Sequence, residues 1–113
     1  MSENKMELYE GMYILSATLS DDARTKALER ITAEIVHHGG SIEKTFEMGR
    51  KRLAYEINKR REGYYYLLYF RAPASFIGEH WKNCKLNEDL IRFMTLRTDE
   101  VLESLEFKPL VQI

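Results

Sequence analysis

An apolar run from Tyr64 to Ala72 constrains the fold of this chain more than any other segment. Every position from Tyr64 to Phe70 carries an aromatic or aliphatic side chain, and Pro73 ends the run. Such a run is too short to span a bilayer and is typical of a buried strand. Since successive side chains of a strand point to opposite faces, the sheet that holds this strand has two apolar faces.

Three more strands are predicted around this run. They are the segments Leu8–Leu15, Ser41–Asn58 and Leu90–Arg97, each rich in apolar residues. In the second of them the apolar positions change parity after Gly49, which predicts a β-bulge at that glycine. The basic segment Lys59–Gly63 is then expected to form the turn of a hairpin.

Two helices are predicted between the strands. The first begins after Ser20, a favourable N-cap residue, and ends at Gly39-Gly40. Its apolar stripe consists of Ala27, Ile31 and Ile35. A shorter helix is expected over Ala74–Cys84, with Ser75 as its cap and Trp81 as its anchor in the core.

The order of these elements, β-α-β-β-α-β, predicts an α+β fold of the ferredoxin-like kind. Two helices would cover one face of a four-stranded antiparallel sheet. The 113 residues suffice for one such domain, expected over residues 8–98. A disordered N-terminus, 1–7, and a C-terminal tail, 99–113, are expected to flank it.

The composition excludes several classes of protein. Cys84 is the only cysteine, so neither an internal disulfide nor a CxxC metal site is possible, and a reducing, cytoplasmic compartment is expected. The polar N-terminus is no secretory signal. His37 and His38 are adjacent, so on a helix they point about 100° apart and cannot share a metal. We therefore expect no metal, no cofactor, no membrane association and no small-molecule substrate.

The face of the sheet opposite the helices is expected to be an interaction surface. Two helices can cover one face only, and side chains of the other parity would then be exposed together. These side chains are Met12, Ile14, Tyr65, Leu67 and Tyr69. Either the C-terminal tail or a second copy of the chain could cover them instead.

A basic segment stands out against a formal net charge of only −1. Gly49–Arg61 reads GRKRLAYEINKRR and holds a single acid, Glu56. A β-hairpin with basic flanks fits a phosphate backbone, so the segment is a candidate RNA-binding surface. The alternative is a solvated hairpin whose charges protect the edge of the sheet.

Several motifs, in order and from about Leu8 to Arg97, resemble bacterial small-subunit ribosomal protein number six. The matching positions are Tyr9-Glu10, Gly49–Tyr55, Ile57–Lys59, Gly63-Tyr64, Ala72-Pro73, Leu86–Asp89, Ile91-Arg92 and Met94. The chain departs from the family pattern at Glu56, where proline is common. It also departs at Gly78 and His80, where larger or apolar residues are usual.

The resemblance implies a structural constituent of the small ribosomal subunit without catalytic activity. It implies two partners, the central domain of 16S ribosomal RNA and small-subunit ribosomal protein number eighteen. The expected RNA-binding residues are Arg50, Lys51, Arg52, Lys59, Arg60, Arg61 and Arg92. The expected partner-binding residues are the five on the open sheet face, Met12, Ile14, Tyr65, Leu67 and Tyr69.

Three other classes of protein share the same order of elements. An RNA-recognition motif would stack splayed bases on sheet tyrosines, and Tyr64–Tyr69 loosely resembles its third strand. An acylphosphatase-like enzyme needs a glycine-rich phosphate loop, but Ser16–Ser20 has neither glycine nor a basic residue. A ligand-sensing regulatory domain remains a further alternative.

Overall fold

The computed structural model describes residues 5–57 and 60–102, with side chains for all of these except 54–57 and 60. Its strands are β1 (Met6–Ser16), β2 (Ser41–Ile57), β3 (Arg60–Pro73) and β4 (Leu90–Arg97). Its helices are α1 (Asp21–His37), the short 3₁₀ turn η2 (Ala74–Phe76) and α2 (Ile77–Leu86). The predicted order β-α-β-β-α-β is therefore confirmed.

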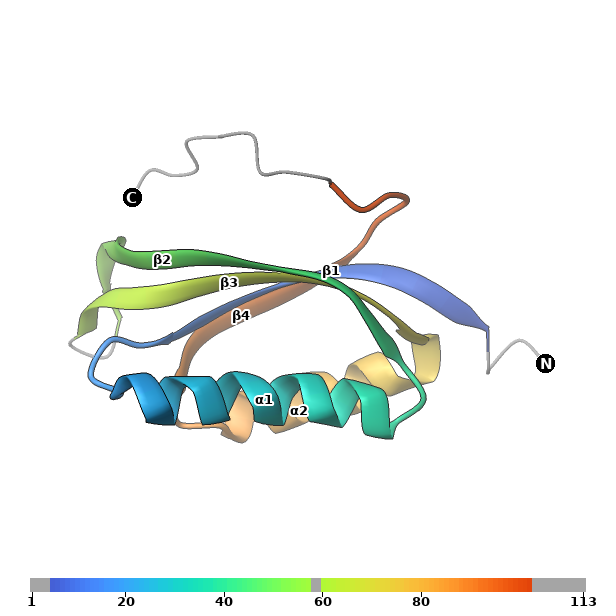
Figure 1. The fold of residues 1–113 in the computed structure, drawn as a ribbon, viewed down its shortest axis with the longest axis horizontal. Coiled ribbons are helices and arrows are strands. Elements are labelled where there is room, and N and C mark those ends of the chain that lie inside the picture. The colour runs from blue at the N-terminus through green and yellow to red at the C-terminus, as the bar shows by residue number, and fades with distance from the viewer. Residues whose placement is uncertain (1–4, 58–59, 103–113) are drawn as a thin grey trace.

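The four strands form one antiparallel sheet in the order β2-β3-β1-β4. Both helices lie under the same face of this sheet, side by side (Figure 1). The ferredoxin-like fold is thus confirmed, and β2 and β4 are its two edges. The main core lies between sheet and helices, where the apolar stripe of α1 meets Tyr13 and Leu15 of β1 and Leu68 and Phe70 of β3.

Local chemistry accounts for both ends of α1. The Ser20 hydroxyl accepts a hydrogen bond from the backbone N–H of Ala23 at 3.1 Å, as expected of an N-cap. At the other end, Gly39 has a φ of +92°, a left-handed conformation that favours glycine. The N–H groups of Gly39 and Gly40 bond back to the carbonyls of Val36 and Ile35.

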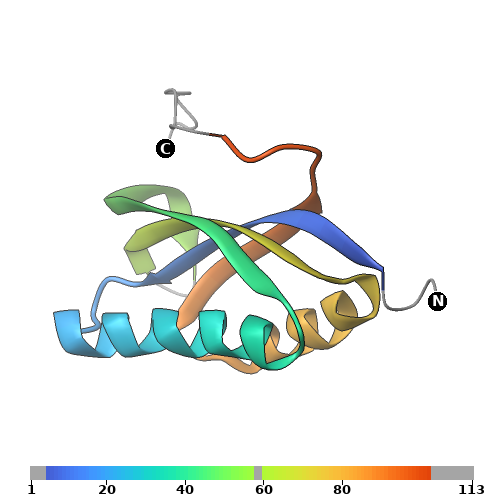
Figure 2. The ribbon, with the colours of Figure 1, turned by 45° about the vertical axis from the view of Figure 1, so that its right-hand side comes forward.

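The predicted bulge in β2 is present. The register against β3 shifts between Glu47 and Gly49, and Gly49 has a φ of +87°. Beyond the bulge the end of β2 bends over the sheet on the side away from the helices (Figure 2). This bend matters for the second face, because it carries Leu53 toward it.

The hairpin between β2 and β3 turns earlier than expected, because β3 already begins at Arg60. Arg60 already pairs with Ile57, and Arg52 pairs with Glu62, so most of the predicted turn Lys59–Gly63 belongs to β3. Cross-strand charge pairing favours this extension, since Arg50 binds Glu62 across the two strands. Lys59 itself lies outside the described residues.

The second helix also begins differently from the prediction. The segment Ala74–Phe76 is a 3₁₀ turn, and α2 follows it with Phe76 as its N-cap. No side-chain hydrogen bond caps α2, so the assignment of Ser75 as the cap was wrong. The tight turn after Pro73 lets Phe76 enter the core directly, where its side chain is buried.

Candidate nucleic-acid and partner interface

The sheet face opposite the helices is largely covered, so its expected exposure was wrong. Ile14, Tyr65 and Leu67 are each no more than 6% exposed, and Tyr69 is 1% exposed. Leu53, brought over by the bent end of β2, forms a second buried cluster with Ile14 and Tyr65. Parity correctly separated the two faces but could not reveal that a strand would bend over one of them.

Tyr69 shows how closely this face is packed. Its hydroxyl donates a hydrogen bond to Glu10 Oε2 at 2.7 Å, and its ring meets Phe46 edge to face at 6.3 Å between centroids. Burial, with the hydrogen bond and charge of Glu10, raises the pKa of Tyr69 to about 12. A tyrosine held in this way supports a surface and does not offer its ring to a ligand.

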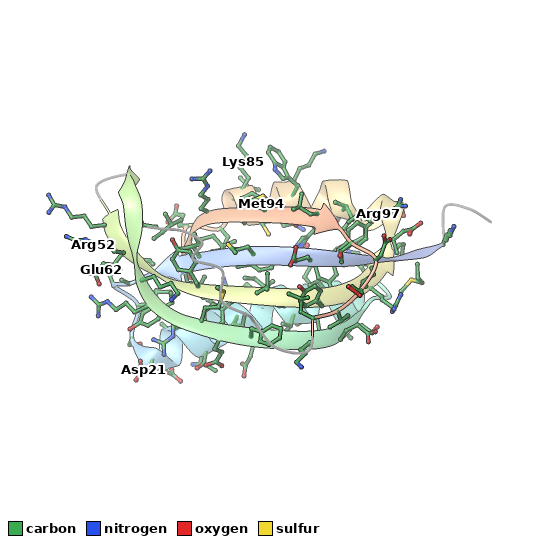
Figure 3. All side chains as sticks on the ribbon, turned by 90° about the horizontal axis from the view of Figure 1, so that it is seen from above. Asp21, Arg52, Glu62, Lys85, Met94 and Arg97 are labelled. Carbon is green, nitrogen blue, oxygen red and sulfur yellow. The ribbon has the colours of Figure 1, made fainter. Side chains whose placement is uncertain are left out.

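An accessible apolar row remains at the β4 side of this face. Met94 and Leu96 are 49% and 54% exposed, and Met94 pairs directly with the partly buried Met12 of β1. Figure 3 looks onto this face and shows Met94 along its β4 edge. The row consisting of Met12, Met94 and Leu96 is the part of the face that another protein can reach. Sequence parity could have identified Met94 and Leu96 as well.

The basic residues gather at one end of the sheet. One row of paired residues runs from Arg92 through Ile14 and Tyr65 to Gly49, crossing all four strands. Three strand spacings separate Arg92 from Gly49, or about 14 Å. Arg92 therefore lies at the same end as the basic segment Gly49–Arg61, although 30 residues of the chain separate them.

One cation at this end of the sheet, Arg50, forms an ion pair with a carboxylate of the neighbouring strand. The Arg50 guanidinium is 2.5 Å from a carboxylate oxygen of Glu62, and this hydrogen bond and charge raise the pKa of Arg50. Lys51 and Arg52 are exposed, as are Arg61 and Arg92. Arg52 and Glu62 both lie at the end of the sheet in Figure 3. Burial raises the pKa of Tyr65, and the positive charge of Arg92 partly offsets this rise.

A buried polar cluster connects the sheet to both helices. His80 of α2 is 1% exposed, with Nε2 at 2.7 Å from the Tyr13 hydroxyl and Nδ1 at 2.9 Å from Glu34 Oε1. Since a carboxylate only accepts, Nδ1 donates to Glu34, and in the neutral ring Nε2 accepts from Tyr13. Cys84 Sγ lies 3.6 Å from His80 Nε2, and burial raises the pKa of the Cys84 thiol to about 12. Such a thiol stays protonated, which argues for a packing role.

Over residues 5–57 and 60–102, no three His, Cys, Asp or Glu side chains come together as a metal site would require. No described helix is both long enough and apolar enough to cross a membrane.

Comparisons with known proteins agree on one family. The family model described as ribosomal protein S6 matches residues 8–97. Small ribosomal subunit protein bS6 of Protochlamydia amoebophila is 64% identical, over 97% of this chain and 96% of that protein. The same protein of Chlamydia felis is 54% identical, over 97% and 98% of the two chains.

A solved structure agrees as well. The crystal structure of 30S ribosomal protein S6 from Thermotoga maritima has a TM-score of 0.78 and 32% sequence identity, covering 83% of this chain and 89% of that one. These matches confirm the resemblance seen in the sequence and the expectation of a ribosomal protein that is not an enzyme. The chain therefore belongs to the ribosomal protein S6 family of the small ribosomal subunit.

Proposed function

We propose that this chain binds the central domain of 16S ribosomal RNA jointly with small-subunit ribosomal protein number eighteen. The observation that carries the RNA part is the basic end of the sheet, where Arg92 of β4 lies in the same row as Gly49 of β2. Cations from separate strands then face one stretch of phosphate backbone. The residues proposed for RNA are Arg50, Lys51, Arg52, Lys59, Arg60, Arg61 and Arg92.

Lys51 and Arg52 are the most available of these cations. Both are exposed, whereas Arg50 already holds Glu62. Breaking that ion pair to reach a phosphate would offset part of the gain, so Arg50 contributes less than its neighbours. Binding of this kind positions the protein on a folded RNA by shape and charge, without reading bases.

The partner protein is proposed to bind the row formed by Met12, Met94 and Leu96. Half-exposed methionine and leucine side chains on an edge strand favour a protein partner, because they lose water on contact. Ile14, Tyr65, Leu67 and Tyr69 would support this row from beneath. A formal net charge of −1 gives the chain little attraction for RNA by itself, so a basic partner would supply much of it.

The burial of the sheet tyrosines argues against the alternative of an RNA-recognition motif. Such a domain stacks bases on rings that face solvent, while Tyr65 and Tyr69 are 6% and 1% exposed.

The test is RNA binding by the purified protein with and without the partner, using a 16S central-domain fragment and an unstructured single strand. We expect binding to the fragment only, and only with the partner. The double variant Lys51→Glu, Arg52→Glu should weaken it about a hundredfold or more, given the loss of several charge contacts. Binding to the single strand without the partner would instead favour a base-stacking domain.

A matched control carries the same change of charge elsewhere. Lys26→Glu, Arg30→Glu reverses two exposed cations on α1 and should leave RNA affinity within a few-fold of the parent. Equal losses in the two double variants would mean that net charge, and not the basic end, governs binding. A third variant, Met94→Asp, should reduce partner binding while the RNA-facing cations stay intact.

A further inference from the structure

Trp81 is the only tryptophan of the chain, and it does not anchor α2 in the core as the sequence suggested. It lies on α2 and is 52% exposed. α2 runs beside the edge strand β4, and Lys85 and Met94 mark these two elements in Figure 3. Tryptophan is enriched at interfaces because its ring is apolar and its N–H is polar, so this half-exposed indole is a candidate contact residue.

The exposed ring is held in place by two neighbours. The Phe93 ring of β4 meets it at a steep angle of 64°, with centroids 6.3 Å apart. The Lys85 ammonium lies over the indole at 4.8 Å from the ring centroid. Because both neighbours come from folded elements, little conformational entropy is lost when a ligand covers the remaining surface.

Two lysines follow Trp81 on α2, and one of them, Lys85, lies over its ring. Lys82 and Lys85 are both exposed, and within the described part of the chain neither forms an ion pair with a carboxylate. Glu79, the acid in the first turn of α2, has its Oε2 at 3.8 Å from Nε2 of His38, which follows α1. An aromatic ring flanked by cations fits an anionic ligand that has a flat face of its own.

We propose that Trp81 stacks on an unpaired base of the ribosomal RNA, with Lys82 and Lys85 contacting the adjoining phosphates. The inference rests on the proposed RNA binding and adds a second contact to it, on α2 instead of the hairpin. Aromatic stacking with flanking cations is how proteins hold unpaired bases without reading their sequence. An apolar protein surface, in contrast, would offer no partner to the charges of the two lysines.

The first measurement is ultraviolet crosslinking in the complex of this chain, the partner protein and the 16S central-domain fragment. We expect a crosslinked nucleotide on the peptide that contains Trp81, identified by mass spectrometry. Trp81→Ala should weaken RNA affinity on the order of tenfold, and Trp81→Phe should recover most of that loss, since phenylalanine keeps a stacking face. Lys85→Gln should make the slope of log affinity against log salt concentration shallower by about one unit, as expected when one phosphate contact is lost.

The control is Leu86→Ala, which trims a more exposed side chain on the same helix and should leave RNA affinity unchanged. A complex that forms normally, gives no crosslink at Trp81 and tolerates Trp81→Ala would overturn the stacking inference and leave the basic end intact. Loss of the partner protein, but not of RNA, in Trp81→Ala would assign the surface to a protein. A chain that binds no RNA in any form would overturn both proposals.

Discussion

His80 is 1% exposed and makes a polar contact through each of its two ring nitrogens. Its ring nitrogens face Tyr13 and Glu34. The ring centroids of Phe70 and Phe76 lie 6.0 Å and 5.1 Å from the centroid of the imidazole. Glu34 also accepts a hydrogen bond from Asn83. A single imidazole therefore ties β1, α1 and α2 together inside the core.

Replacing His80 by leucine should destabilise the fold by about 2–3 kcal/mol, because the buried Tyr13 hydroxyl then loses its hydrogen bond to the imidazole and Glu34 loses its bond to Nδ1. Adding Tyr13→Phe to this variant should restore part of the loss, since removing both partners leaves neither end of the Tyr13–His80 hydrogen bond unsatisfied. Urea unfolding of the parent, the two single variants and the double variant measures the coupling. Additive losses would mean that the hydrogen bond is not the cause. His37→Ala, at an exposed site on α1, is the control.

Alkaline pH should destabilise the fold through Cys84 and Tyr69. Burial raises the pKa of Cys84 from 9.0 to about 12 and that of Tyr69 from 10.0 to about 12. At a pH above the ordinary pKa of each group, the unfolded chain has released the proton, while the folded chain still retains it. The free energy of unfolding therefore falls as pH rises. Urea midpoints between about pH 7 and about pH 11 should show this decline. It should be shallower in Cys84→Ala, and parallel declines would exclude the thiol as a source.

At the scale of the elements, local chemistry made most of the fold predictable. The cap at Ser20, the stripe of α1 and the bulge at Gly49 each follow from residues within a few positions of one another. The bend that brings Leu53 over the second face does not, because it depends on how a twisted strand pairs with its neighbours. The start of α2 was missed for a similar reason, since Phe76 reaches the core before the helix begins.

The candidate site was predictable in part. The cations of the basic segment could be chosen from the sequence, and Arg92 through the family resemblance. That Arg92 and Gly49 share one row of the sheet depends on the register of three strand pairs, which no local pattern contains. Nor could the sequence separate buried Tyr69 from exposed Met94, since both occupy the same face.

Two glycines should respond to alanine with opposite signs. Gly49 has a φ of +87°, so Gly49→Ala should lower the free energy of unfolding by about 1 kcal/mol. Gly78 lies within α2 with no atom near the added methyl group, so Gly78→Ala should raise it by up to about 1 kcal/mol. Thermal or urea unfolding of both variants compares them in one series. A destabilised Gly78→Ala would mean that α2 needs its glycine for a reason other than backbone freedom.

For the whole molecule, near-neutral charge and local asymmetry together set the salt dependence of RNA binding. The formal net charge is −1, so attraction comes from the few cations at the contact and not from the overall field. With ~3–5 phosphate contacts, tenfold more salt should weaken binding to the 16S fragment by about three to four decades. Filter binding or fluorescence anisotropy over a range of potassium chloride measures the slope. A flat slope would contradict a phosphate-based contact.

The strand order also has a consequence for how the molecule forms during its synthesis. β1 is made first among the strands yet lies between β3 and β4, and Tyr9 pairs with Arg97 near the end of the described chain. The first strand to leave the translating ribosome therefore waits for both of its neighbours while β2 and β3 can already pair as a hairpin. A protein that joins a ribosome can thus complete its own sheet only after another ribosome has made its fourth strand.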